Sequence, residues 1–140
     1  MNEILRKCKD WYDMTEGFCE VLCHGENHML DIQLKTCNLP YRHVIAMSDG
    51  KSLYLHCDVA VISADKYAEA VLLASEMNAT YSYAIARVTQ SNDGNYELTL
   101  IRFDLVNVNV ESCSDLCSMG VNLIEDEINK FAQRINEVSM

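Results

Sequence analysis

The stretch from Asp65 to Leu105 constrains the fold of this chain most, because it joins an amphipathic helix to a β-hairpin. Its first part, KYAEAVLLASEMNATYSYAIARV, has apolar residues at helical spacing. The expected buried stripe consists of Tyr67, Ala70, Val71 and Ala74, widened by Leu73 and Met77. Two β-type runs follow, and Asn92-Asp93-Gly94-Asn95 between them is a strong hairpin signal because Asp, Asn and Gly tolerate positive φ.

The loop residues also set an expected register for this hairpin. If Asn92–Asn95 is the loop, Ser91 pairs with Tyr96, and one face holds the pairs Val88/Thr99, Ala86/Ile101 and Ala84/Phe103. Small side chains opposite large ones are expected where helices cover a sheet. The other face mixes apolar and guanidinium groups, which suits an interface, although an ordinary half-exposed face is the alternative. The predicted partner-binding residues are Tyr83, Ile85, Arg87, Leu98, Leu100 and Arg102.

The flanking segments complete an α+β pattern. Residues 3–15 predict a helix that buries Ile4, Cys8, Trp11 and Thr15. A hairpin is expected from Phe18 to Lys35 with one buried face, then strands at Tyr41–Met47 and Leu53–Val59, and Ser63 is the expected N-cap of the second helix. A last helix after Ser112 is expected to bury Leu116, Met119, Leu123, Ile128, Phe131 and Ile135, with Gly120 marking its start or a close contact.

These elements predict one domain, residues 1–140, in the order α-β-β-β-β-α-β-β-α, with helices packed on one face of an antiparallel sheet. The formal net charge of −10 opposes nonspecific binding to nucleic acid or to an anionic membrane. No apolar run approaches the roughly 20 residues of a membrane span, and the N-terminal residues lack a signal-peptide core. We therefore expect a cytoplasmic protein.

The seven cysteines are an odd number without an export signal, so we expect reduced thiols packed in the core rather than disulfides. Cys19, Cys23, His24 and His28 form a C-x₃-C-H-x₃-H string of zinc-ligand types, but the spacing fits no common finger. Cys113 and Cys117 lack a second pair, and the run at residues 125–127 is expected to be a solvated helix face. No catalytic motif or phosphate loop stands out, so we expect no enzyme activity, no cofactor and no metal. A small metal- or redox-responsive protein is the alternative hypothesis.

Several segments together resemble the YbjN-like family of bacterial proteins, which are described as candidate regulators of sensory transduction. The matching segments are AVLLASEMN (70–78), YSYAIARV (81–88), NDGN (92–95) and YELTLIRFDL (96–105), followed by a long C-terminal helix. The resemblance implies the fold of type III secretion chaperones, whose class I members are small, acidic, usually dimeric cytoplasmic proteins that bind extended segments of secreted partners. It implies no active-site residues. We expect a non-enzymatic protein-binding or regulatory protein, chaperone-like and homodimeric, with a protein or peptide partner, and no nucleic acid or membrane.

Overall fold

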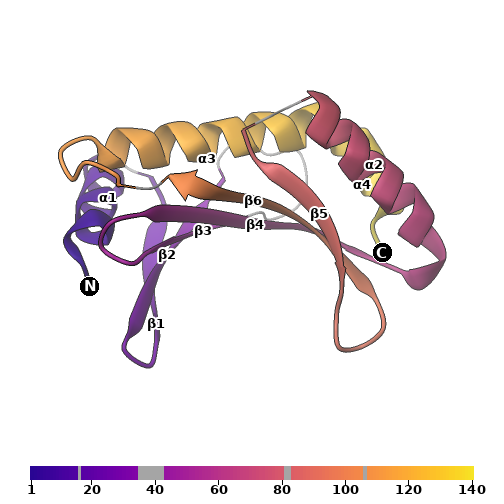
Figure 1. Cartoon of the computed structure of the whole chain (residues 1–140), viewed down its shortest axis with the longest axis horizontal. Coiled ribbons are helices and arrows are strands. Elements are labelled where there is room, and N and C mark those ends of the chain that lie inside the picture. Colours follow the sequence, from indigo (N-terminus) through magenta and orange to yellow (C-terminus); the bar gives the residue numbers. More distant parts are fainter. Residues whose placement is uncertain (16, 35–42, 81–82, 106) are drawn as a thin grey trace.

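The computed structural model describes the chain apart from residues 16, 35–42, 81–82 and 106, and apart from the side chains of residues 103–105. Six strands form one antiparallel sheet in the order β1-β2-β3-β4-β6-β5 (Figure 1). The predicted α+β class with an antiparallel sheet is confirmed. The elements are α1 (Glu3–Met14), β1 (Cys19–His24), β2 (Asn27–Gln33), β3 (His43–Ser48), β4 (Leu53–Ile62), η1 (Ala64–Lys66), α2 (Tyr67–Thr80), β5 (Ile85–Gln90), β6 (Tyr96–Leu105), α3 (Cys113–Lys130) and α4 (Ala132–Val138).

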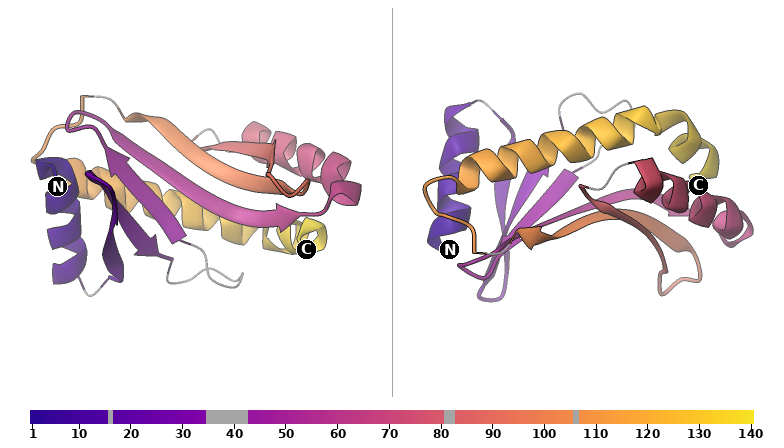
Figure 2. Two further views of the ribbon diagram at one scale, coloured as in Figure 1. Left: turned by 90° about the horizontal axis from the view of Figure 1, so that it is seen from below. Right: turned by 45° about the horizontal axis from the view of Figure 1, so that its top comes forward.

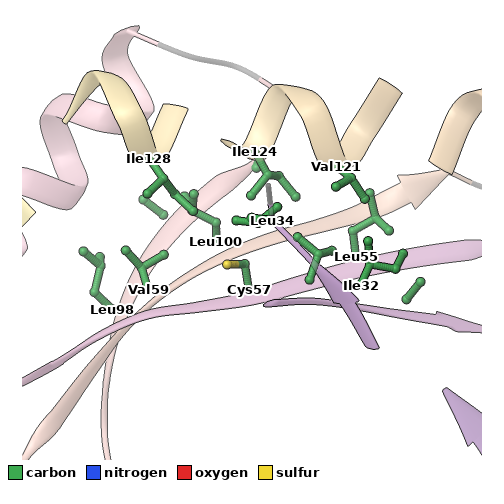
Figure 3. Packing of buried hydrophobic residues seen from close by; sticks show 14 of the residues in the cluster. Ile32, Leu34, Leu55, Cys57, Val59, Leu98, Leu100, Val121, Ile124 and Ile128 are labelled. Atoms are coloured by element: carbon green, nitrogen blue, oxygen red, sulfur yellow. The ribbon is translucent and has the colours of Figure 1, made fainter. Parts of the chain in front are cut away.

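Helix α3 runs across one side of the sheet, with α1 near one end and α2 and α4 near the other (Figure 1). Seen from the opposite side, no helix lies in front of the central strands (Figure 2, left). The core lies between α3 and the sheet, where residues of α3 point toward residues of β4 and β6 (Figure 3). Ile124 and Ile128 from α3, and Leu55, Cys57 and Leu100 from the sheet, are each 0% exposed. The predicted placement of helices on one face therefore agrees with the structure.

The hairpin β5–β6 has a different register from the predicted one. The loop has three residues, Asn92–Gly94, because Ser91 N donates to Asn95 O (2.8 Å) and Gly94 N donates to Ser91 O (3.2 Å). Gly94 adopts φ +87° in the last loop position, as a type I turn followed by a bulge requires. The pairs are consequently Val88/Leu98 and Ala86/Leu100, one residue away from the prediction. A slip of one residue exchanges the faces of a strand, so the predicted faces of β6 are wrong.

The buried stripe of the last helix is also displaced from the prediction. Leu116 and Leu123 are only partly buried and Met119 is 47% exposed, whereas Ile128, Phe131 and Ile135 are buried as predicted. The stripe is displaced because small residues allow α3 to approach its neighbours closely: a Cβ on Gly120 would lie 2.5 Å from Leu55 Cδ1. The helix also divides at Phe131, between α3 and α4. The first two thirds of α3 bury Cys113, Cys117, Gly120, Val121 and Ile124.

Helix α2 buries Ala70, Leu73, Ala74 and Met77 as predicted. The predicted burial of two further residues of this helix is wrong, because the side chain of Tyr67 is 42% exposed and that of Val71 is 40% exposed. The predicted N-cap, Ser63, lies at the N-cap position of the short 3₁₀ helix η1, which leads directly into α2, but its side chain makes no capping hydrogen bond. Its hydroxyl donates to the carboxylate of Asp65 (2.5 Å) instead of accepting from the backbone.

The N-terminal elements match their predicted ranges more closely than their predicted burial. Helix α1 buries Ile4 and Cys8, but Trp11 is only half-buried and Thr15 is exposed. In β1 only Cys19 is buried, because the far end of the β1–β2 hairpin extends away from the helices (Figure 1). The beginning of the third predicted strand, Tyr41 and Arg42, lies outside the described residues.

Asn78 blocks the free edge of β5. Its side-chain amide donates to Ala86 O (3.0 Å), and its Oδ1 accepts from Ala86 N (2.7 Å), as a neighbouring strand would.

We expect Asn78→Ala to lower the free energy of unfolding by about 1–3 kcal/mol in urea melts, because two main-chain groups lose their partner. Ser75→Ala is the control. Ser75 lies on the exposed side of the same helix, and its replacement by alanine raises helix propensity about as much as Asn78→Ala does. Equal stability of the two variants would contradict this role of Asn78.

Candidate protein-binding surface

The sheet face opposite α3 is covered by no helix of the described chain (Figure 2, left). We call it the outer face. Strand pairing places one ladder of residues across it, in which Asp31 pairs with Ile45, Ile45 with His56, His56 with Ile101, and Ile101 with Ile85. Neighbouring ladders add further positions. The pairings place on the outer face Met29, Asp31, His43, Ile45, Met47, Tyr54, His56, Asp58, Ile85, Arg87, Thr99 and Ile101, together with Glu20, Gln33, Thr89 and Glu97.

The centre of the outer face carries two histidine–carboxylate pairs. His43 Nδ1 lies 2.6 Å from Asp31 Oδ1, and His56 Nε2 lies 2.7 Å from Asp58 Oδ1. The hydrogen bond that His56 donates to the Asp58 carboxylate raises the pKa of His56 and lowers the pKa of Asp58. Each pair places opposite charges beside each other when the histidine is protonated. The centre of the outer face therefore combines apolar side chains with two histidine–carboxylate pairs, a mixed composition that is common at protein interfaces.

A hollow of about 420 Å³ lies at one end of the outer face. Met29, Met47 and Tyr54 of the outer face contribute to its wall. The β1–β2 turn and the β3–β4 turn complete it with polar residues. These further lining residues are His24, Asn27, His28, Ser48 and Asp49. Methionine side chains adapt to differently shaped apolar partners, so the hollow suits the side chain of a bound protein or peptide.

Of the six residues predicted for partner binding, the structure leaves two on the outer face. Ile85 is 60% exposed, and Arg87 is also exposed. Leu98 and Leu100 are 0% exposed on the helix side, so their assignment to a surface is wrong, and the one-residue register shift is the reason.

Tyr83 and Arg102 are half-buried and contact each other. The guanidinium carbon of Arg102 lies 4.3 Å from the centroid of the Tyr83 ring, and Arg102 Nη1 donates to Tyr83 O (2.5 Å). The aromatic ring and the cation thus stabilise each other within the chain.

Sequence reasoning missed the contribution of β3 and the central part of β4 to the outer face. The alternation of Tyr54, His56 and Asp58 with buried residues in β4 was the available signal.

The cysteines pack mainly as small apolar side chains. Five of them, Cys8, Cys19, Cys57, Cys113 and Cys117, are buried and Cys23 is exposed, while Cys37 lies outside the described residues. A hydrogen bond with Cys117, together with burial, raises the pKa of Cys8 far above its usual range, and burial raises the pKa values of Cys19 and Cys113 to about 11. Thiols in such surroundings react slowly because the thiolate is the nucleophile. In the described part of the chain, no three His, Cys, Asp or Glu side chains are grouped to hold a metal ion.

The acidic run on α3 is not the solvated face that we predicted. Glu125 is 8% and Glu127 is 1% exposed, and only Asp126 between them is exposed. Burial raises the pKa of Glu127 to about 7. Its Oε1 has no hydrogen-bond partner within the described structure. A hydrophobicity pattern assigns charged residues to the solvent-exposed side of a helix, so it cannot reveal a buried carboxylate.

Comparisons with known proteins support the fold and go no further. No family model matches the sequence, and no curated protein matches it significantly. Among solved structures, the fold is similar to the crystal structure of YbjN from E. coli, a candidate transcription regulator, with a TM-score of 0.66 and 12% sequence identity over 92% of this chain and 91% of that chain. At this identity the likeness shows the fold alone, and the expected YbjN-like fold is confirmed. Within the described residues, none of the helices combines the length and the apolar character needed to cross a bilayer.

Proposed function

We propose that this chain is a non-enzymatic, regulatory or chaperone-like protein of the bacterial cytoplasm that holds a protein or peptide partner on its outer face. The uncovered outer face carries the proposal. Ile45, Met47 and Tyr54 lie there partly exposed in neighbouring strands, and Ile85 is 60% exposed, whereas Ile101 between them is buried at 2% exposed. A sheet face with this many apolar residues normally packs against another layer, so a bound partner would supply that layer.

Two further observations support a regulatory protein that acts through protein contacts. The similar fold of YbjN, a candidate transcription regulator, favours regulation by analogy of fold. The net charge of −10 opposes direct binding of this chain to the phosphates of DNA or to an anionic membrane. In the reducing cytoplasm the exposed thiol of Cys23 would remain free.

A second copy of the chain is one partner that the outer face suits. Like net charges repel, so self-association requires a contact that is apolar or locally compensated. The centre of the outer face meets this requirement, because its two histidines lie beside carboxylates and Arg87 lies across Thr99 from Asp58. We therefore include a homodimer in the proposal.

The test compares Ile85→Glu/Arg87→Glu with Met14→Glu. Met14 is 83% exposed at the end of α1, away from the outer face, so its variant controls for adding a carboxylate at an exposed apolar site. We expect wild type and Met14→Glu to retain the same partner from an extract of the native host, and the double variant to lose about tenfold in affinity for that partner after purification. Light scattering of the wild type should give twice the monomer mass of 15.9 kDa.

Two results would contradict the proposal. Unchanged partner affinity in a folded double variant would show that the outer face is not the binding site. A wild type that remains monomeric at high micromolar concentration would show that the homodimer is wrong, independently of the partner. Circular dichroism verifies that each variant is folded.

A further inference from the structure

Helix α2 has apolar residues on both of its sides. Its buried side packs in the core, but Val71 and Leu72 on the other side are 40% and 67% exposed. A surface helix normally presents charged residues to water on the side away from the core. Here that side has apolar and small residues at helical spacing. We call Ala68, Val71, Leu72, Ser75 and Ala79 the α2 stripe.

A hollow of about 280 Å³ adjoins the α2 stripe, between α2 and α4. These helices lie at the same end of the molecule and contact each other (Figure 1). Leu72, Leu73 and Val138 give the hollow an apolar lining. Its polar lining residues are Glu69, Arg134 and Glu137. The hollow has room for an apolar side chain of a bound segment, and the small residues of the α2 stripe permit a close approach of its backbone.

The charges around the hollow favour a cationic occupant. Arg134 is ion-paired with Glu76, so its charge is compensated within the chain. Glu69 has no ion-pair partner within the described residues. Lys66 Nζ donates to the main-chain oxygen of Glu137 (2.6 Å). Together η1, α2 and α4 contain four acidic and two basic residues. A second copy would bring the same acidic excess, so a basic partner complements this surface better.

We propose that the α2 stripe and the adjoining hollow bind an amphipathic helix of a partner protein, with Lys or Arg residues flanking its apolar side. An apolar anchor of that helix enters the hollow beside Leu72, and a flanking cation pairs with Glu69. This is the helix-in-groove mode of recognition, in which apolar side chains at helical spacing supply the contact. The surface is separate from the outer face, so this inference does not depend on the proposed function.

Two labelled peptides of equal length test the proposal, one of Leu and Lys and one of Leu and Glu, both patterned as amphipathic helices. Fluorescence anisotropy in about 0.15 M salt measures their affinity for the full chain. We expect the Leu/Lys peptide to bind and the Leu/Glu peptide not to bind. Leu72→Ser and Glu69→Lys should each weaken binding about tenfold. Asp126→Lys makes the same charge change on an exposed part of α3 and should have at most about a twofold effect.

Several outcomes would overturn the proposal. If Leu72→Ser binds the Leu/Lys peptide like the wild type, the α2 stripe is not contacted. If Asp126→Lys weakens binding as much as Glu69→Lys does, the peptide responds only to the overall acidity of the chain. If Leu72→Ser converts a dimeric wild type into a monomer by light scattering, the occupant is a second copy. Ile85→Glu, on the outer face, should bind the Leu/Lys peptide like the wild type, and a loss of binding there would place the peptide on the outer face.

Discussion

Leu98→Glu is expected to leave the chain unfolded at 25 °C, whereas Ile85→Glu should fold like the wild type. Leu98 is 0% exposed and points into the core beneath α3 (Figure 3), while Ile85 is 60% exposed on the neighbouring strand. Truncation of a buried leucine costs about 2–5 kcal/mol, and an unpaired buried carboxylate costs several kcal/mol more. The sum approaches the total stability of about 5–15 kcal/mol that is typical of a domain. Circular dichroism and urea melts give the comparison.

Leu98→Met is the control for this prediction, because it conserves volume and should cost less than about 1.5 kcal/mol. A folded Leu98→Glu variant with wild-type stability would contradict the observed register and restore the predicted one. The predicted register placed Phe103 of the same strand on the helix-covered face, and its side chain lies outside the described residues.

The sequence predicted the elements well because each depends on local periodicity. The alternation from Leu53 to Val59 predicted the buried face of β4, and the spacing of Ala70, Leu73, Ala74 and Met77 predicted the buried side of α2. Both patterns are properties of a single segment. They need no knowledge of what the segment packs against.

The candidate site was predicted less well because it depends on the relation between segments. Asn92–Asn95 was correctly identified as a turn, but the choice between a three- and a four-residue loop decides which face of β6 is buried. The buried residues predicted for the N-terminal part of α3 were wrong for a related reason. Close packing of Gly120 against Leu55 favours small residues, whereas hydrophobicity alone favours the leucines and methionines beside them. The outer face combines residues from several strands, and its composition follows only once their order and register are known.

Glu127→Gln is expected to stabilise the chain at pH 8 and to have a much smaller effect at pH 5. Burial raises the pKa of Glu127 from its usual 4.5 to about 7 in the folded chain, where the side chain is 1% exposed. As the pH rises above 4.5, the carboxyl ionises in the unfolded chain first, so folding becomes less favourable. The penalty is complete above pH 7 and amounts to about 3 kcal/mol. Glutamine has the same shape and remains neutral, so the variant avoids this penalty.

The difference in the free energy of unfolding between variant and wild type isolates this carboxyl from other titrating groups. His56, whose pKa is raised by Asp58, also loses its stabilising contribution as the pH rises, but it does so equally in both proteins. Asp126→Asn removes a carboxylate from the exposed position next to Glu127, so its difference from the wild type should change little between pH 5 and pH 8. Urea melts across this range measure both differences. A Glu127→Gln difference that stays constant with pH would mean that the carboxyl ionises normally, either because water reaches it or because α3 is displaced there.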